Sequence, residues 1–211
     1  MVREIPDVVI QRLPQYLRAV RSLKDKGASL VNSKELGIES DVTPAQLRKD
    51  LSYFGKFGKQ GNGYRVETLL KDLIRILGLD HSWPVILIGV GRLGNAILTY
   101  PDFTPEGFHV QSAFDSDPKI IGTEVSNITI KPVSSMEQYI IENKIEIAIL
   151  AVPGESAQDL IDSLVESGVR GILNYAPITP KVSNHIQIQT IDPVHALQSM
   201  TFYLAENRIH Q

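Results

Sequence analysis

The chain has 211 residues, 43% of them hydrophobic, which is enough for a buried core in one large or two small domains. It contains no cysteine, and this excludes disulfides, thiolate metal sites and thiol redox chemistry. There is no run of 18 apolar residues and no charged-then-apolar leader at Met1, so we expect neither a membrane span nor a secretory signal and place the protein in the cytoplasm.

The net charge of −3 hides an asymmetry along the chain. Residues 1–78 carry 14 Lys and Arg against 9 Asp and Glu, a net charge of +5, whereas residues 79–211 carry 7 against 15, a net charge of −8. A basic front module suggests a polyanionic partner. The five histidines are scattered without metal-ligand spacing, so we expect no metal site.

The front of the chain predicts two helices first. Apolar residues at helical spacing over 13–23 indicate a helix that ends near Gly27, with Pro14 starting or bending it. A shorter second helix fits Ser33–Leu36 and is closed by Gly37.

A third helix and a hairpin follow. Thr43 is a suitable N-cap and Pro44 a suitable first helical residue, and the helix is expected to run until Gly55. Residues 56–64 are rich in glycine and resemble a β-hairpin tip, or wing, before helical spacing returns over 66–77.

This order of elements describes a winged helix-turn-helix, in which the third helix enters the DNA major groove. Arg48 and Lys49 lie on that helix, and Lys56 and Lys59 flank the wing, where they could reach phosphates. The alternative is that Arg48, Lys49 and Asp50 form only a solvated charged face. The net charge of +5 favours DNA binding.

The rear of the chain alternates strands and helices, which predicts an α/β domain with a parallel sheet. We expect strands at Val85–Ile88, Val110–Phe114, Ile145–Val152, Val169–Asn174 and Ile186–Ile191. Between them we expect helices from Arg92, near Met136–Asn143 and at Ser156–Glu166.

A Gly-x-Gly-x-x-Gly motif, residues 89–94, directly follows the expected strand Val85–Ile88. Gly89 permits the tight turn, Gly91 lets the backbone approach a pyrophosphate, and Gly94 lets the helix pack closely on the strand. Asp115 lies 21 residues beyond Gly94, where it would accept ribose hydroxyls and repel a 2′-phosphate. The sequence therefore predicts a Rossmann site for NAD(H) rather than NADP(H).

The last helix, Val194–Asn207, carries one apolar stripe formed by Val194, Leu197, Met200, Tyr203 and Leu204. It could fold back on its own sheet or dock on a second subunit. We expect an N-terminal all-α winged helix-turn-helix domain (1–80), a C-terminal α/β Rossmann domain (81–192) and a terminal helix (193–211), with the join within residues 78–84.

The stretch from Gln46 to Tyr64 resembles the recognition helix and wing of the Rex redox-sensing transcriptional repressors. Further matches span nearly the whole chain, at 89–94, Tyr100-Pro101, 114–118, 151–153 and 172–177. The resemblance implies a homodimer that binds palindromic operator DNA, releases it when NADH rises, and exchanges its terminal helix between subunits.

The resemblance also implies roles by position. The DNA-facing residues would be Gln46, Arg48, Lys49, Tyr53, Lys56 and Lys59. The adenosine and pyrophosphate half of NAD(H) would be held by Gly89, Val90, Gly91, Arg92, Leu93, Gly94 and Asp115, and the nicotinamide lined by Ala151, Pro153, Asn174, Tyr175 and Pro177. Links between domains across the dimer would involve Arg18, Tyr100 and Asp192.

The chain departs from the family pattern at Gln60, Ile120, Pro193 and Ala196. Two other functions are weighed against a non-enzymatic repressor. An NAD-dependent oxidoreductase with an N-terminal extension is disfavoured, because there is no Tyr-x-x-x-Lys pair and His195 has no carboxylate partner in the pattern. A CoA-binding module is disfavoured because Asp115 would repel a ribose 3′-phosphate.

Overall fold

A computed structural model describes residues 5–55, 57, 63–101 and 103–209. The chain divides into two compact units, Met1–His81 and Ser82–Gln211. No helix among the described residues is both long and apolar enough to cross a membrane.

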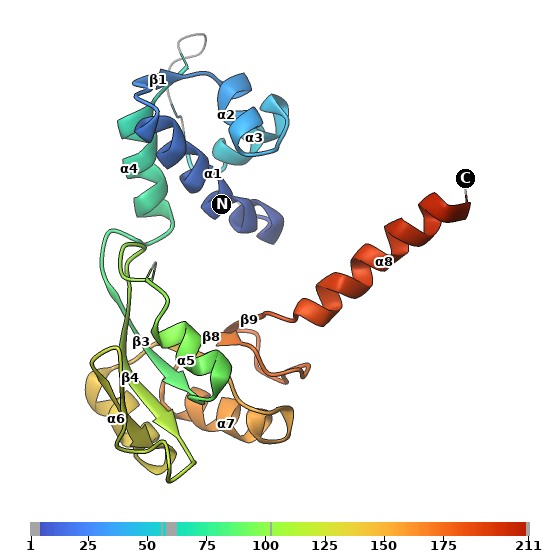
Figure 1. Ribbon diagram of the computed structural model, residues 1–211. Coiled ribbons are helices and arrows are strands. Elements are labelled where there is room, and N and C mark those ends of the chain that lie inside the picture. The colour runs from blue at the N-terminus through green and yellow to red at the C-terminus, as the bar shows by residue number, and fades with distance from the viewer. Residues whose placement is uncertain (1–4, 56, 58–62, 102, 210–211) are drawn as a thin grey trace. The chain divides into compact units, whose positions relative to one another are not determined.

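The first unit is helical with one small antiparallel ladder (Figure 1). Its elements are α1 (Asp7–Asp25), β1 (Leu30–Val31), α2 (Ser33–Glu39), α3 (Pro44–Leu51), β2 (Tyr64–Arg65) and α4 (Val66–Ile76). In the ladder Val31 pairs with Tyr64. All four helices contribute to one apolar core, which includes the fully buried Tyr16, Leu36, Leu47 and Leu73.

Two predicted helix boundaries in this unit are wrong. Helix α1 begins at Asp7, and Pro14 lies inside it on the exposed side; the apolar period already starts at the buried Val9. Helix α2 continues through Gly37 to Glu39. Gly37 is needed for packing rather than for ending the helix, because a Cβ there would lie 2.7 Å from the carbonyl oxygen of Val42.

The third helix begins as predicted but ends early. Thr43 caps it, its Oγ1 accepting the N–H of Gln46 at 3.1 Å, and Pro44 occupies the first turn. The helix ends at Leu51, and the chain then tightens, with the N–H of Phe54 bonding to the carbonyl of Leu51 at 3.0 Å. The predicted wing tip lies mostly outside the described residues.

The second unit holds a seven-stranded sheet in the order β5-β6-β4-β3-β7-β8-β9, in which all pairs except β5-β6 are parallel. The strands are β3 (Trp83–Ile88), β4 (Phe108–Asp115), β5 (Glu124–Val125), β6 (Ile128–Pro132), β7 (Ile147–Leu150), β8 (Gly171–Asn174) and β9 (Gln187–Thr190). The helices are α5 (Arg92–Leu98), the short 3₁₀ turn η1 (Val133–Ser135), α6 (Met136–Asn143), α7 (Gly154–Ser167) and α8 (Pro193–Ile209).

The central strands are apolar on both sides because helices cover both faces of the sheet. Ile86 and Ile88 of β3 pack in one cluster with α6 and α7, whereas Val85 and Leu87 pack in a second cluster with α5. The predicted fold class, a helical DNA-binding module followed by a parallel α/β domain, is confirmed.

The β5-β6 hairpin was not predicted. Its two turn residues, Ser126 and Asn127, both have positive φ, at 50° and 63°, as the tight hairpin turn that matches strand twist requires. The turn has the sequence Ser-Asn rather than the Asn-Gly or Asp-Gly that usually marks such a turn. Because positive φ at a serine is also uncommon, the sequence does not indicate this hairpin.

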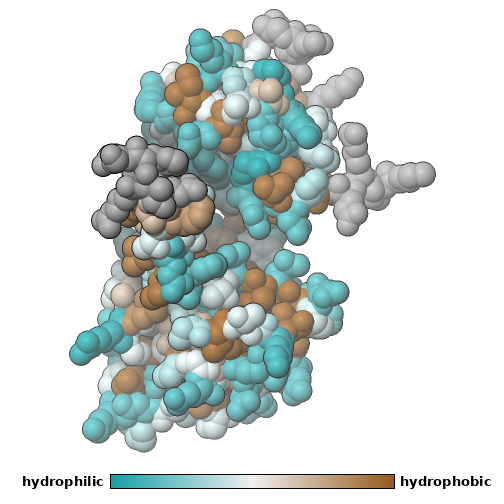
Figure 2. All heavy atoms as spheres, turned by 90° about the vertical axis from the view of Figure 1, so that its right-hand side faces the viewer, coloured by the Kyte–Doolittle hydropathy of each residue, from teal (hydrophilic) through white to brown (hydrophobic). Residues whose placement is uncertain are grey.

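Helix α8 leaves the apolar residues of its expected stripe exposed in the single chain. The stripe residues are each between 58% and 66% exposed, namely Val194, Leu197, Met200, Tyr203 and Leu204. Of the two outcomes left open by the sequence, burial on the helix's own sheet is therefore not observed. Other hydrophobic side chains also reach the surface, and Figure 2 shows several such groups among hydrophilic neighbours on the face it draws.

Candidate functional site

The three glycines of the loop after β3 have different surroundings. Gly89 has a φ of +88°, and a Cβ there would lie 2.8 Å from Val152 Cγ1. A Cβ on Gly94 would lie 2.9 Å from the carbonyl carbon of Gly89 and collide with its oxygen. A Cβ on Gly91, by contrast, would meet nothing within 4 Å. Of the three glycines, Gly91 is therefore the one with open space beside it, which fits close approach of a pyrophosphate.

Asp115, the last residue of β4, holds this loop in place. Its Oδ2 accepts the N–H of Val90 at 2.6 Å, and its Oδ1 accepts the N–H of Asp117 at 2.8 Å. The side chain is only partly buried, and a carboxylate offers about four lone-pair positions. Asp115 can therefore fix the glycine loop and still accept a hydrogen bond from a ribose hydroxyl.

The predicted nicotinamide-lining residues lie at the same edge of the sheet as the glycine loop. Backbone hydrogen bonds join successive strand ends: Gly89 N–H to Phe114 O at 2.8 Å, Ala151 N–H to Ile88 O at 2.8 Å, and Tyr175 N–H to Leu150 O at 2.8 Å. The segments that follow β3, β7 and β8 are thus neighbours at the carboxyl ends of parallel strands, where open α/β sheets bind ligands.

The walls of this edge are mostly apolar. Ala151, Val152 and Tyr175 are partly buried, and Pro153 and Pro177 are exposed. Asn174 differs from the role expected for it, since its side chain is 0% exposed. Its amide donates to Ala176 O at 3.0 Å and its Oδ1 accepts the N–H of Ala176 at 3.0 Å. Asn174 therefore shapes the turn after β8 from inside the protein.

Helix α3 in the first unit presents the predicted DNA-facing cations. Arg48 and Lys49 are exposed, and Arg48 Nη1 donates to Ser33 Oγ at 2.7 Å, which steadies the guanidinium against α2. Tyr53 is partly buried just after the helix. Lys56 and Lys59 lie outside the described residues.

Asp50 does not belong to a solvated charged face, so that alternative is wrong for this residue. It is 0% exposed, and its carboxylate accepts hydrogen bonds from Arg12, Tyr16 and Gln46. Burial alone raises the pKa of Asp50, but these hydrogen bonds together outweigh it and leave the pKa below its ordinary value. The sequence did carry a signal, because Asp50 shares the helical phase of the buried Leu47 and Leu51.

The three residues expected to link domains lie in different units. Arg18 is exposed on α1 in the first unit. In the second unit Tyr100 is 54% exposed and packs edge-on against Phe103 at 5.4 Å between ring centroids, and Asp192 Oδ1 accepts the N–H groups of Val194 and His195 at 2.9 and 3.2 Å. Asp192 thereby caps the start of α8.

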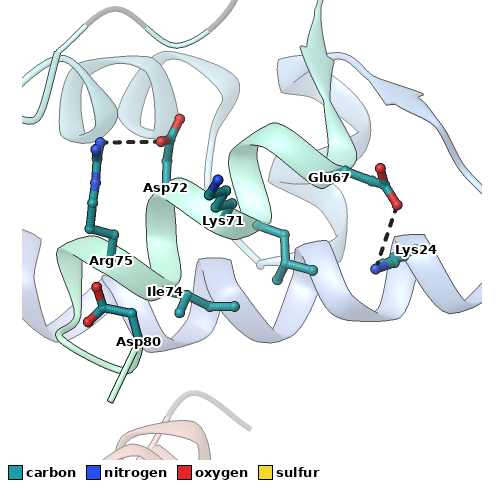
Figure 3. A pocket seen from close by; sticks show the side chains of 8 residues that line it. Lys24, Glu67, Lys71, Asp72, Ile74, Arg75 and Asp80 are labelled. Atoms are coloured by element: carbon teal, nitrogen blue, oxygen red, sulfur yellow. Dashed lines mark hydrogen bonds and ion pairs between the residues drawn. The ribbon is translucent and has the colours of Figure 1, made fainter.

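A separate hollow of about 330 Å³ lies between α1 and α4 of the first unit (Figure 3). Two ion pairs lie among its lining residues. Lys24 of α1 pairs with Glu67 of α4 at 3.8 Å, and Arg75 pairs with Asp72 within α4 at 3.3 Å. None of the predicted site residues lines this hollow. Among the described residues no cluster of His, Asp and Glu side chains could hold a metal ion.

Comparison with known proteins assigns the two units of the chain to different family models. Residues 80–178 match the family model described as "CoA binding domain", and residues 4–52 match the one described as "Putative DNA-binding protein N-terminus". The chain is 51% identical over 205 residues to the redox-sensing transcriptional repressor Rex of Chloroflexus aurantiacus, covering 97% of each chain. It is 42% identical to that of Syntrophomonas wolfei, covering 98% of each.

Two solved structures extend the similarity to the whole fold. The structure of RSP in complex with β-NAD⁺ and operator DNA superimposes with a TM-score of 0.93 at 36% identity, covering 98% of this chain and 95% of that one. The structure of RSP in complex with β-NADH gives a TM-score of 0.87 at 34% identity, covering 98% and 97%.

The fold defines a class of protein that combines a helix-turn-helix unit with a Rossmann unit. More narrowly, the chain belongs to the Rex family of redox-sensing transcriptional repressors.

Proposed function

We propose that this chain is a redox-sensing transcriptional repressor that binds palindromic operator DNA and releases it when NADH binds. The observation that carries the proposal is the presence, in one chain, of a capped helix with exposed cations and a glycine loop that is held by Asp115 and has open space at Gly91. Its full-length relatives are named as repressors of this kind.

NAD(H) is the ligand that this Rossmann site fits best. The matching family model is described by CoA binding, but CoA carries a 3′-phosphate on its ribose, and the Asp115 carboxylate would repel it. A related structure was solved with NADH and another with NAD⁺. Gly89, Val90, Gly91, Arg92, Leu93, Gly94 and Asp115 are proposed to hold the adenosine and pyrophosphate half.

Selection of the reduced form is proposed to arise at the apolar edge formed by Ala151, Pro153, Tyr175 and Pro177. NAD⁺ and NADH differ by one positive charge on the nicotinamide, and an apolar wall disfavours the charged ring because it loses its hydration. The side chain of Asn174 acts indirectly in this proposal, by holding the turn that carries Tyr175 and Pro177.

DNA binding is proposed to use Arg48, Lys49 and Tyr53 from the described residues, with Lys56 and Lys59. A helix-turn-helix dimer reads two half-sites about one helical turn apart. The apolar stripe of α8 is exposed in the single chain, and a second copy is the partner that we propose for it, with Arg18, Tyr100 and Asp192 linking units within the dimer. Such a protein would act in the cytoplasm and would not be an enzyme.

A gel-shift titration tests the proposal. The probe is a palindromic duplex enriched from a random-sequence pool by the protein itself, titrated with NADH or NAD⁺ in matched salt. We expect NADH to remove the shifted band at concentrations where NAD⁺ does not. If neither nucleotide changes the apparent affinity, the sensing function is refuted. Turnover of NADH with small carbonyl substrates would instead support an oxidoreductase.

A further inference from the structure

Helix α3 is anchored on its inner side by one buried carboxylate. Asp50 Oδ2 accepts hydrogen bonds from Arg12 Nε at 2.7 Å and from the Tyr16 hydroxyl at 2.6 Å. Asp50 Oδ1 accepts from Arg12 Nη2 at 3.0 Å and from Gln46 Nε2 at 2.6 Å. Arg12 and Tyr16 both belong to α1, so two side chains of α1 donate three hydrogen bonds to one carboxylate of α3.

This anchor lies away from the side of α3 that carries the exposed cations. At 3.6 residues per turn, Asp50 points about 200° around the helix from Arg48 and about 100° from Lys49. Leu47 and Leu51 also bury the inner side, but apolar contacts are not directional and tolerate a small rotation of the helix. The fork between Arg12 and the carboxylate is directional and fixes one rotational setting.

The arrangement is poorly explained by stability alone. The Asp50 side chain is 0% exposed and the Arg12 side chain 22% exposed, so the pair is buried on the carboxylate side. Exchange of a buried ion pair for apolar side chains of similar size is often neutral or stabilising, because the buried charge no longer has to be desolvated. A buried pair can instead specify which of several similar packings a helix adopts. For an eight-residue helix that must present Arg48 and Lys49 to DNA, the rotational setting matters directly.

We propose that Asp50 is a positioning residue for operator recognition: together with Arg12 and Tyr16 it sets the rotation of α3, and Gln46 acts on Asp50 rather than on a base. The inference rests on the proposed DNA-binding function. It assigns Gln46 a different role from the other residues of its helix that face DNA, since its amide nitrogen is engaged within the protein.

The test is the double variant Arg12→Met, Asp50→Leu in the full-length chain. It removes one cation and one anion, so the net charge that attracts DNA is unchanged. Affinity is measured for the enriched palindromic duplex and for an unselected duplex of equal length at the same salt. We expect selectivity, the ratio of the two affinities, to fall at least tenfold while non-specific binding and NADH affinity are retained.

A matched control removes a different ion pair of the same unit. Lys26 follows the last residue of α1, and its Nζ lies 2.8 Å from Oε1 of Glu39 at the end of α2, but Lys26 is largely exposed. Lys26→Gln, Glu39→Gln leaves the net charge unchanged in the same way. We expect its selectivity to equal that of the unsubstituted protein.

A folded double variant with native selectivity would overturn the proposal. If the double variant does not fold, Tyr16→Phe decides, because it removes a single oxygen and one hydrogen bond to Asp50: a several-fold loss of selectivity supports the proposal, and unchanged selectivity overturns it. If the unsubstituted protein enriches no duplex from the pool, the DNA-binding function itself has failed, and this result is distinguishable from both.

Discussion

The Asp115 carboxylate accepts the backbone N–H of Val90 at 2.6 Å, so the residue expected to read the ribose also holds the glycine loop expected to cradle the pyrophosphate. The two halves of the proposed nucleotide site are thereby coupled through one side chain. A change at Asp115 should affect both.

Asp115→Asn is expected to weaken NADH binding by about 10- to 100-fold, corresponding to roughly 1.4–2.8 kcal/mol, and to reduce discrimination against NADPH. The amide no longer repels a 2′-phosphate, and it accepts fewer hydrogen bonds. Titration calorimetry with both nucleotides measures this. Asp117→Asn is the matched control two residues away, and equal losses in the two variants would contradict the assignment.

Two glycines of the loop predict opposite defects. Gly91→Ala adds a methyl group where the protein leaves open space, so we expect native stability and loss of NADH binding. Gly94→Ala drives a methyl group into the carbonyl of Gly89, so we expect a lower melting temperature, by several degrees or more. Thermal unfolding and nucleotide titration of both variants separate the two effects. Retained NADH affinity in Gly91→Ala would place the pyrophosphate elsewhere.

Arg48→Ala and Lys49→Ala are each expected to lower operator affinity about tenfold, to reduce its salt dependence, and to leave NADH affinity intact. The exposed Lys71 of α4 offers a control of equal charge, since Lys71→Ala should change operator binding little. Fluorescence anisotropy over a range of salt concentrations provides the measurement. Simultaneous loss of DNA and NADH binding would indicate misfolding or a misplaced site.

The Asp50 anchor predicts a stability change at high pH. Burial, with the hydrogen bond to Asp50, raises the pKa of Tyr16 from 10.0 to about 12. The native state thus holds this proton more tightly than the unfolded chain, so the stabilisation is full below pH 10 and is lost as the pH rises toward 12. Urea unfolding should show the free energy of unfolding falling over that window, and falling less in Tyr16→Phe. Identical slopes would contradict the assignment.

Asp50 gives the opposite dependence at low pH. Its pKa is lowered below the ordinary value of 3.8, so its stabilisation is present above that pH and is lost as the pH falls further.

At alkaline pH a second tyrosine contributes. Burial also raises the pKa of Tyr64, and for this reason the alkaline slope of the free energy of unfolding is expected to shrink rather than vanish in Tyr16→Phe.

Local signals in the sequence were sufficient for much of this architecture. The Thr43-Pro44 start of α3 and the bounds of α6, Met136–Asn143, are as predicted, because capping chemistry and apolar spacing act over a few residues. The glycine loop was predictable because each of its glycines serves a separate steric need.

Other features depend on contacts that periodicity and propensity do not indicate. The helical phase of Asp50 indicates burial, but its partner Arg12 lies 38 residues away and cannot be identified from local pattern. Gly37 reads as a helix end until Val42 approaches it. Asn174 reads as a ligand contact until its side chain is seen to bond the backbone of Ala176. The Arg12 contact joins distant parts of the chain, and the other two are turn contacts that residue types alone do not specify.

The central claim is that the reduced coenzyme, bound at the Rossmann unit, controls the affinity of the helical unit for DNA. Its most direct measurement is the apparent affinity for the enriched duplex at fixed total coenzyme, as the NADH fraction is varied from none to all. A ligand shifts a two-state protein only through differential affinity, so we expect a steep fall in DNA affinity as that fraction rises. The same affinity at every ratio would contradict the account.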